Sequence, residues 1–294
     1  MVVISKKIVK GKVYYYLEHS ARANRKITKK VKYLGSQVPK DIEKIKSEFL
    51  SEIYKEKWLN LLDGIKKNYG QELKKTPKSA KEKETENFAI RFTYDSNRIE
   101  GSTLTLRETG LLLKEGVAPK DRPLKDIKEA ESHRKVFYLM LEHTKDLSLQ
   151  TMLHWHKELL KDTEPGVAGK IREHGVTISG SRFVPPGPVE LYPLLKEFFG
   201  WYERNKSRLH PVELAALVHL KFVTIHPFGN GNGRISRLMM NFVLHRHGYP
   251  MLDIEYPNRK SYYNALERSQ IKKQEYVFLQ WLFRRYMKEF KKYL

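Results

Sequence analysis

Apolar side chains recur at helical spacing along most of the chain. Residues 211–225 carry them every three or four positions, and residues 235–243 repeat this spacing until a Gly-Tyr-Pro sequence at 248–250 interrupts it. We therefore predict two buried helices joined by a short loop, with the second helix beginning near Gly233. The same period predicts further helices over residues 88–99, 105–115, 124–142, 148–160 and 189–204.

The first 87 residues follow other patterns. Residues 12–19 and 27–34 alternate in the manner of short strands around a turn at residues 23–24. Residues 41–86 are mostly helical, but residues 71–86 are highly charged and contain a proline, so we expect an exposed connection or a frayed helix there. The patterns predict a mainly α chain in three parts: a small basic β appendage at 1–40, a helical and charged connector at 41–87, and a large helical domain at 88–294.

Charge distinguishes the appendage from the rest of the chain. The whole sequence has a formal net charge of +22, and residues 1–40 hold eleven lysines and arginines against one acidic residue, Glu18, a net charge of +10. Four tyrosines, residues 14–16 and Tyr33, lie among these basic residues. Basic side chains interleaved with aromatic rings are typical of nucleic-acid binding, which makes nucleic acid a candidate partner of residues 1–40. A solvated sheet that docks on an acidic protein or on the helical core is the alternative interpretation.

The sequence contains no cysteine, which excludes disulfides and thiol catalysis. It also contains no secretory segment and no apolar run long enough to cross a membrane. We therefore expect a cytoplasmic protein without a membrane partner. The oligomeric state stays open at this level, and a homo-oligomer is one alternative.

Residues 226–237, His-Pro-Phe-Gly-Asn-Gly-Asn-Gly-Arg-Ile-Ser-Arg, combine three features of phosphate chemistry. His226 is of the residue type that most often transfers protons near neutral pH. The Gly-Asn-Gly sequence at 231–233 lets backbone N–H groups approach an anion at the start of a helix. Arg234 and Arg237 are three residues apart, so they share a helix face that suits the clamping of a polyphosphate. A glycine-rich turn with solvated arginines is the alternative.

The whole string resembles the signature of the Fic (filamentation induced by cAMP) family, His-x-Phe-x-Asp/Glu-Gly-Asn-Gly-Arg-x-x-Arg, and matches seven of its eight fixed positions. The resemblance covers about residues 88–290 and implies a Fic-type helical bundle with a β-hairpin flap. It also implies that His226 is the catalytic base. The positions that it assigns to nucleotide phosphates are Gly229, Asn230, Gly231, Asn232, Gly233, Arg234 and Arg237.

Asn230 departs from the signature, because the family usually has at this position a carboxylate that helps to hold Mg²⁺. An amide oxygen can ligate a hard cation, but without a charge it should bind the cation more weakly. We expect Mg²⁺ or Mn²⁺ to be held chiefly by the phosphates of ATP, with Asn230 as a weak ligand.

A second motif lies upstream, at residues 96–101, Ser-Asn-Arg-Ile-Glu-Gly. It resembles the inhibitory Ser/Thr-x-x-x-Glu-Gly/Asn motif of Fic proteins, in which the glutamate pairs with the second arginine of the signature. The resemblance makes Ser96, Glu100 and Gly101 inhibitory residues and implies that Glu100 engages Arg237, blocking the site of the ATP γ-phosphate. A helix that merely ends at Gly101 is the alternative.

Two further segments resemble parts of Fic proteins. Residues 169–188 combine a strand-like stretch with glycines and prolines, as in the β-hairpin flap that covers the nucleotide and registers the target. An ordinary surface hairpin is the alternative. The flap positions are Ile178, Ser179, Gly180 and Ser181. In the helix after the signature, Tyr262, Tyr263 and Gln270 take the places of residues near the adenine and ribose, although tyrosines at helical spacing also serve simply as packing.

The resemblance implies a protein adenylyltransferase that moves AMP from ATP onto a Ser, Thr or Tyr hydroxyl of a target protein, with the chain itself among the candidate targets. One rival interpretation is removal of AMP from a modified protein at the same site. Another is a non-catalytic Fic-like adaptor whose basic N-terminal segment binds nucleic acid or an acidic partner.

Overall fold

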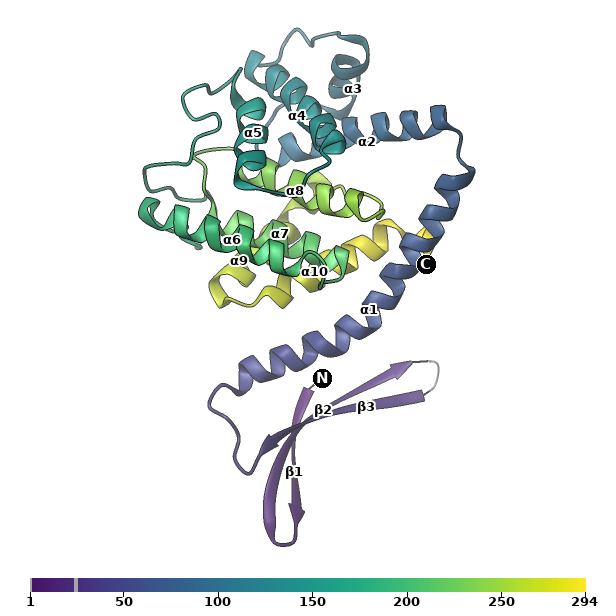
Figure 1. Cartoon of the computed structure of the whole chain (residues 1–294), viewed down its shortest axis with the longest axis vertical. Coiled ribbons are helices and arrows are strands. Elements are labelled where there is room, and N and C mark those ends of the chain that lie inside the picture. The colour runs from purple at the N-terminus through teal and green to yellow at the C-terminus, as the bar shows by residue number, and fades with distance from the viewer. Residues whose placement is uncertain (1, 24–25) are drawn as a thin grey trace. The chain divides into compact units, whose positions relative to one another are not determined.

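The structure is a computed structural model that describes residues 2–23 and 26–294. The chain divides into two compact units, Met1–Asp63 and Gly64–Leu294. The division falls inside the long helix α1 (Ile42–Lys75), which Figure 1 shows as one continuous helix. The boundaries predicted after residues 40 and 87 stay predictions.

The N-terminal unit contains a three-stranded antiparallel sheet in the order β1-β2-β3. The strands are β1 (Val2–Val9), β2 (Lys12–Ala23) and β3 (Lys26–Gly35). β2 and β3 confirm the two predicted strands, whereas β1 was not predicted. Part of the predicted turn, Asn24, lies outside the described residues. Leu17 in the middle of β2 is buried, as are Phe49 and Trp58 on α1, so the unit has a small core of its own.

The second unit is built from helices, as the apolar periods predicted (Figure 1). They are α2 (Lys78–Ile99), α3 (Leu106–Glu115), α4 (Leu124–Glu142), α5 (Leu149–Leu160), α6 (Leu191–Asn205), α7 (Pro211–Ile225), α8 (Asn232–Arg246), α9 (Arg259–Lys272) and α10 (Glu275–Glu289). Short 3₁₀ turns lie at Pro188–Glu190, Tyr256–Asn258 and Lys291–Tyr293. α7 and α8 pack against each other and are buried along most of their length, so the loop between them starts from the centre of the core.

The junction of α1 and α2 differs from the sequence-based expectation. Residues 71–86 were predicted to be an exposed connection or a frayed helix, but α1 continues to Lys75 and α2 begins at Lys78. Only Thr76 and Pro77 interrupt the helix, because proline has no N–H to continue the hydrogen-bond pattern. Glu72 accepts hydrogen bonds from Lys292 Nζ (3.0 Å) and from the Tyr293 hydroxyl (3.1 Å), which ties this charged segment to the C-terminal turn. The prediction of a frayed segment was wrong.

Among the described residues, no helix is both long and apolar enough to cross a membrane.

Candidate active site

The loop between α7 and α8 places His226 where one helix ends and the next begins. α7 ends at Ile225, and His226 adopts a left-handed backbone conformation (φ 52°, ψ 56°) while its N–H donates to the Phe222 carbonyl at 3.1 Å. The chain turns again at Gly231, whose φ of 78° favours glycine, and α8 starts at Asn232. The predicted helix-loop-helix is confirmed. The unpaired N–H groups of the first turn of α8 therefore border the loop that begins with His226.

The Asn232 side chain holds this loop in shape. Its Oδ1 accepts the N–H of Phe228 at 3.0 Å, and its Nδ2 donates to the Phe228 carbonyl at 2.8 Å. The Phe228 ring is fully buried and stacks on the His156 ring, with centroids 3.5 Å apart and planes 1° from parallel. The side chain of Asn232 thus supports the loop, which leaves backbone N–H groups as the groups that can face an anion.

His156 supports the loop from α5, a role that the sequence did not assign to it. Its Nδ1 accepts the N–H of Gly169 at 2.9 Å, so the ring proton is on Nε2, which lies 3.0 Å from the Asn230 carbonyl. Burial lowers the pKa of His156 to about 4, which keeps the ring neutral. His156 therefore links the loop to the start of the predicted flap segment.

The His226 side chain is set up as a neutral base. Its Nδ1 lies 3.3 Å from the Val223 carbonyl, and because a carbonyl only accepts, the ring proton is on Nδ1 and Nε2 is the unprotonated atom. Burial lowers the pKa of His226 below its usual value near 6.5. At neutral pH the imidazole can therefore accept a proton through Nε2.

Arg237 is buried and forms hydrogen bonds with several residues outside its own helix. Its Nη2 donates to Glu100 Oε1 at 2.7 Å and to the Ser96 carbonyl at 3.0 Å, and its Nε donates to Ser96 Oγ at 2.9 Å. Burial alone would raise the pKa of Glu100, but the guanidinium groups of Arg237 and Arg234 outweigh it and lower the pKa. The contact between Glu100 and Arg237 is present, and Glu100 is ionised at neutral pH. Glu100 is also the C-cap residue of α2, so the motif forms a helix end as well.

Gly233 is required by the approach of Glu100. A Cβ built on Gly233 would lie 2.2 Å from Glu100 Oε1 and 3.0 Å from Arg237 Nη1. Any larger residue would have to displace one of these two side chains. The glycine thus allows the carboxylate to reach the first turn of α8.

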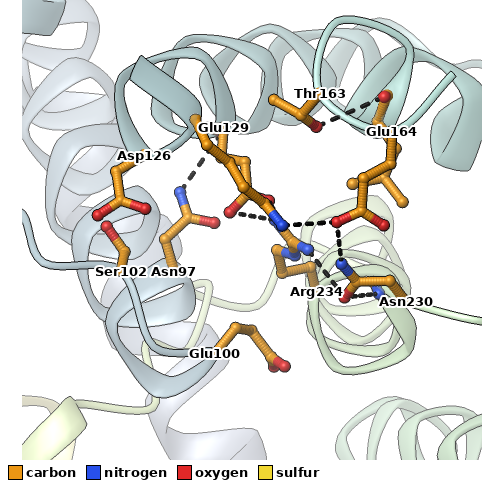
Figure 2. Close-up of polar contacts among 12 residues, drawn as sticks. Asn97, Glu100, Ser102, Asp126, Glu129, Thr163, Glu164, Asn230 and Arg234 are labelled. Carbon is orange, nitrogen blue, oxygen red and sulfur yellow. Dashed lines mark hydrogen bonds and ion pairs between the residues drawn. The ribbon is translucent and has the colours of Figure 1, made fainter. Parts of the chain in front are cut away.

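Arg234, the other arginine of the string, is held by a second carboxylate (Figure 2). Its Nη1 lies 2.9 Å from Glu129 Oε2 of α4, and both side chains are buried, with exposed fractions of 1% and 8%. Its Nη2 donates to Asn230 Oδ1 at 3.2 Å, while Asn230 Nδ2 donates to Glu164 Oε1 at 2.9 Å. Asn97 Nδ2 lies 3.5 Å from the Glu129 carbonyl, which links the end of α2 to α4. No motif in the sequence indicated Glu129 or Glu164.

The predicted flap forms a turn but not a β-hairpin. Ser181 N donates to the Ile178 carbonyl at 3.0 Å and Gly180 has a φ of 74°, so residues 178–181 form a turn at the tip of this segment; their role as a flap over a nucleotide stays a prediction. All of residues 169–188 are described, and none of them belongs to a strand, so the predicted strand pairing was wrong. The tip's Arg182 N–H donates to Glu267 of α9 at 2.9 Å rather than to an opposite strand, and Pro185 and Pro186 have no N–H to donate.

Arg172 closes the base of this flap instead. It is 4% exposed, and its Nη1 and Nη2 donate to the carbonyls of His174 (2.8 Å) and Pro186 (2.6 Å), which belong to the two arms. Its Nε donates to the carbonyl of His226 at 2.8 Å. The guanidinium therefore connects the flap to His226, the residue predicted to be the catalytic base. No motif in the sequence indicated Arg172, because a single arginine in an irregular segment carries no local signal of its contacts.

The three residues predicted to lie near the adenine and ribose have different contacts. Tyr262 is buried beside Arg237, with the hydroxyl oxygen 3.5 Å from Arg237 Nη1, and burial raises its pKa to about 12. The Tyr263 hydroxyl donates to the Ile99 carbonyl at 3.0 Å. Gln270 instead contacts Thr224 at 3.3 Å in a cavity of about 650 Å³ below the flap. Their roles toward a nucleotide stay predictions.

The chain resembles known proteins over the part that contains this site. Residues 146–244 match the Fic/DOC family. Two curated proteins named "Protein adenylyltransferase Fic" are each 36% identical to it: the one from Culex quinquefasciatus over 183 residues and the one from Drosophila melanogaster over 178 residues. These alignments cover 60% and 59% of this chain but only 36% of either relative. The chain therefore spans about a third of the length of these relatives.

Solved structures agree with this resemblance. A Fic domain containing signaling protein from Bacteroides thetaiotaomicron superposes with a TM-score of 0.70 at 28% identity, covering 78% of this chain and 95% of that protein. A fragment of Fic-1 from C. elegans, residues 134–508, superposes with a TM-score of 0.71 at 24% identity, covering 83% of this chain and 72% of the fragment, and supports the fold alone.

Proposed function

We propose that the chain, whose residues 146–244 match the Fic/DOC family, transfers AMP from ATP onto a hydroxyl group of a protein. The observation that carries the proposal is a neutral histidine, His226, on the loop that opens the helix carrying two buried arginines. In the reaction, the hydroxyl oxygen bonds to the α-phosphorus as the bond from the α-phosphorus to the bridging oxygen of the β-phosphate breaks. Pyrophosphate leaves.

His226 would accept the hydroxyl proton during this attack. Its Nε2 is the unprotonated nitrogen because Nδ1 faces the Val223 carbonyl. The lowered pKa keeps the ring neutral at physiological pH, so the base is ready before the substrate arrives. Arg172 fixes the position of the same residue by binding the His226 carbonyl at 2.8 Å. Arg172 is thus a positioning residue.

The start of α8 would hold the phosphates. Backbone N–H groups at residues 229–233 and the positive end of the helix favour negative charge. Arg234 and Arg237 follow on the same helix and would contact the terminal phosphates. Their positive charge would matter because phosphoryl-type transfer depends mainly on positioning and on charge stabilisation. Each arginine currently binds a carboxylate, Glu129 or Glu100.

The residues present fit a divalent cation that arrives with ATP. The described part of the chain has no cluster of three or more His, Asp or Glu side chains that could hold a metal alone. Asn230 Oδ1 and the neighbouring Glu164 carboxylate are hard oxygen ligands, but Asn230 Oδ1 already accepts from Arg234 and Gly231, and Glu164 Oε1 from Lys125 and Asn230. The phosphates would therefore supply most of the ligands, as is usual for Mg²⁺. Such a cation would neutralise charge on the phosphates.

Glu100 would act as a brake on this reaction. Its carboxylate binds the Arg237 guanidinium, so a terminal phosphate must compete with an ionised partner that is already in place. Charge-assisted hydrogen bonds of this kind contribute about 1.5–3 kcal/mol. ATP would then bind with its γ-phosphate displaced, and its α-phosphate would lie out of line for attack.

Labelled ATP tests the proposed transfer. In the Glu100→Gly variant, ATP labelled at the α-phosphate should label protein, whereas ATP labelled at the γ-phosphate should not, because that phosphate leaves as pyrophosphate. His226→Ala in the same variant should reduce labelling by about 100-fold or more. His154→Ala, an exposed histidine on α5, is the matched control and should label normally. Equal labelling of the two histidine variants would overturn the proposal.

Removal of AMP from a modified protein is the second candidate. The Glu100 carboxylate favours this second candidate. A group that orients an attacking water must be ionised and reachable by solvent, and Glu100 is ionised and has 27% of its side chain exposed. The two candidates differ in the effect of Glu100→Gly. That substitution should increase labelling if transfer dominates and should abolish AMP release if removal dominates.

A further inference from the structure

One face of the N-terminal sheet gathers tyrosine and lysine side chains. The register pairs Tyr14 with Lys7 and Tyr16 with Tyr33, and side chains of paired residues lie on the same face of a sheet. Tyr14 and Tyr16 are two apart on β2, so they share that face as well. The ring centroids of Tyr16 and Tyr33 are 5.3 Å apart, those of Tyr14 and Tyr33 are 6.1 Å apart, and Lys7 Nζ lies 4.9 Å above the Tyr16 ring. We call Lys7, Tyr14, Tyr16 and Tyr33 the tyrosine face.

The opposite face of the sheet is used for packing. Leu17, between Tyr16 and Glu18 on β2, is 0% exposed. Lys32, which pairs with Leu17 in the register, lies 3.7 Å from Glu52 of α1. The tyrosine face, by contrast, is open to solvent at Tyr33, which has 56% of its surface exposed, whereas Tyr14 and Tyr16 are half-buried.

The charge around this face selects a polyanion. Residues 1–40 hold eleven lysines and arginines and one acidic residue, Glu18, which Lys29 already binds at 2.7 Å. Lys10 and Lys12 are exposed at the turn between β1 and β2, next to the edge that carries Lys7. Any negatively charged partner would be attracted to this unit.

We propose that the tyrosine face binds single-stranded nucleic acid. Clustered aromatic rings on a sheet are the platform on which unpaired bases stack, and lysines around them contact the backbone phosphates. The bases of a duplex are stacked on one another and cannot stack on the tyrosine rings. An acidic peptide would contact the lysines but would not stack on the rings. The combination of three neighbouring rings with excess positive charge therefore favours the single strand over either. This activity is independent of AMP transfer, because it uses other residues in the other unit.

The test measures binding of the full-length protein to labelled oligonucleotides by fluorescence anisotropy. Single strands of about 12 nucleotides, oligo(dT) and oligo(U), match the length that such platforms cover. Tyr33→Ala should weaken binding by about tenfold, whereas Tyr33→Phe should bind like the wild type, because the ring alone provides stacking. Lys7→Ala should reduce the slope of log affinity against log salt by about 0.7, as expected for one lost phosphate contact.

Competitors decide between the partner classes. A duplex of the same length, heparin, poly-glutamate and anionic lipid vesicles should compete less well than the single strand. Equal competition by heparin or vesicles, together with unchanged binding by Tyr33→Ala, would overturn the proposal and leave a plain cationic surface.

Ultraviolet cross-linking of oligo(dT) to the wild type provides a measurement that needs no variant. Oligonucleotide cross-linked to Tyr14, Tyr16 or Tyr33 would support the proposal. Oligonucleotide cross-linked only to residues 64–294 would contradict it.

Discussion

The two units of the chain use positive charge in opposite ways. In the N-terminal unit, Lys32 and Glu52 are 3.7 Å apart with side chains 35% and 66% exposed. In the helical unit, Arg234 and Arg237 are each 1% exposed, and each lies within 3 Å of a carboxylate oxygen. An exposed ion pair contributes about 0–1 kcal/mol to the stability of the fold, because water screens the two charges. A buried charge destabilises the fold unless it has an oppositely charged partner.

The difference indicates two kinds of recognition. Exposed lysines attract a polyanion from any direction, and salt weakens that attraction. Buried arginines recognise a phosphate through fixed geometry, and a carboxylate that takes the place of the phosphate can switch them off. The predictions below test how strictly this distinction holds.

Breaking the buried pair of Arg234 should have the largest effect. Glu129→Gln keeps the shape of the side chain but removes the charge that faces Arg234 at 2.9 Å. The guanidinium then stays buried but loses its nearest counter-ion, so the free energy of unfolding should fall by about 3–5 kcal/mol. ATP should also raise the melting temperature of this variant more than that of the wild type, because phosphate can replace the lost charge. Thermal and chemical unfolding measure both effects.

The control for this prediction comes from the other unit. Glu52→Gln removes the carboxylate near Lys32 and should change the free energy of unfolding by less than about 1 kcal/mol. If Glu129→Gln and Glu52→Gln lowered the free energy of unfolding by similar amounts, burial would not explain the difference between the charges of the two units.

Gly233→Ala should have an intermediate effect that depends on Glu100. The added Cβ would lie 2.2 Å from Glu100 Oε1, so one of the two must move, at a cost of about 1–3 kcal/mol. In the Glu100→Gly variant that contact is gone, and the same alanine should be tolerated much better. A double-mutant cycle measured by denaturant unfolding checks this. Equal cost in both backgrounds would mean that Gly233 serves the helix rather than the ion pair.

The pH dependence of transfer should show the lowered pKa of His226. Burial favours the neutral imidazole, so the midpoint of the decline in activity with falling pH should lie below 6.5, the usual value for histidine. Below the pKa, the rate should fall about tenfold for each pH unit. The profile is measured in the Glu100→Gly variant, so that protonation of Glu100 does not contribute. A midpoint at or above pH 6.5 would contradict the assignment of a buried neutral base.

Local sequence predicted the parts of the site that lie close together along the chain. The string at 226–237 placed His226, the glycines and both arginines correctly on one loop and the helix that follows, because glycine and apolar spacing act locally. The contact of Glu100 with Arg237 was predicted only through the resemblance to Fic proteins, and its regulatory role stays a proposal.

The residues that were missed come from elsewhere in the chain. His156 reaches Asn230 across 74 positions, and Glu129 and Arg172 also precede the loop by more than fifty residues. A histidine, glutamate or arginine on a helix or in a loop gives no local signal of what it will contact. The flap shows the reverse case: Val176 to Ile178 have strand propensity, but no strand forms, and the N–H of Arg182 after the turn donates to Glu267 of α9 instead.

The ion pair between Glu100 and Arg237 is the central claim, and self-labelling by ATP labelled at the α-phosphate tests it most directly. The measurement compares initial rates for the wild type, Glu100→Gly, and Glu100→Gly combined with Arg237→Ala. Loss of the charge-assisted bond should raise the rate by about one to two orders of magnitude in Glu100→Gly. The double variant should lose activity because the γ-phosphate then has no partner. A wild type as active as Glu100→Gly would contradict the claim and reduce residues 96–101 to the end of a helix.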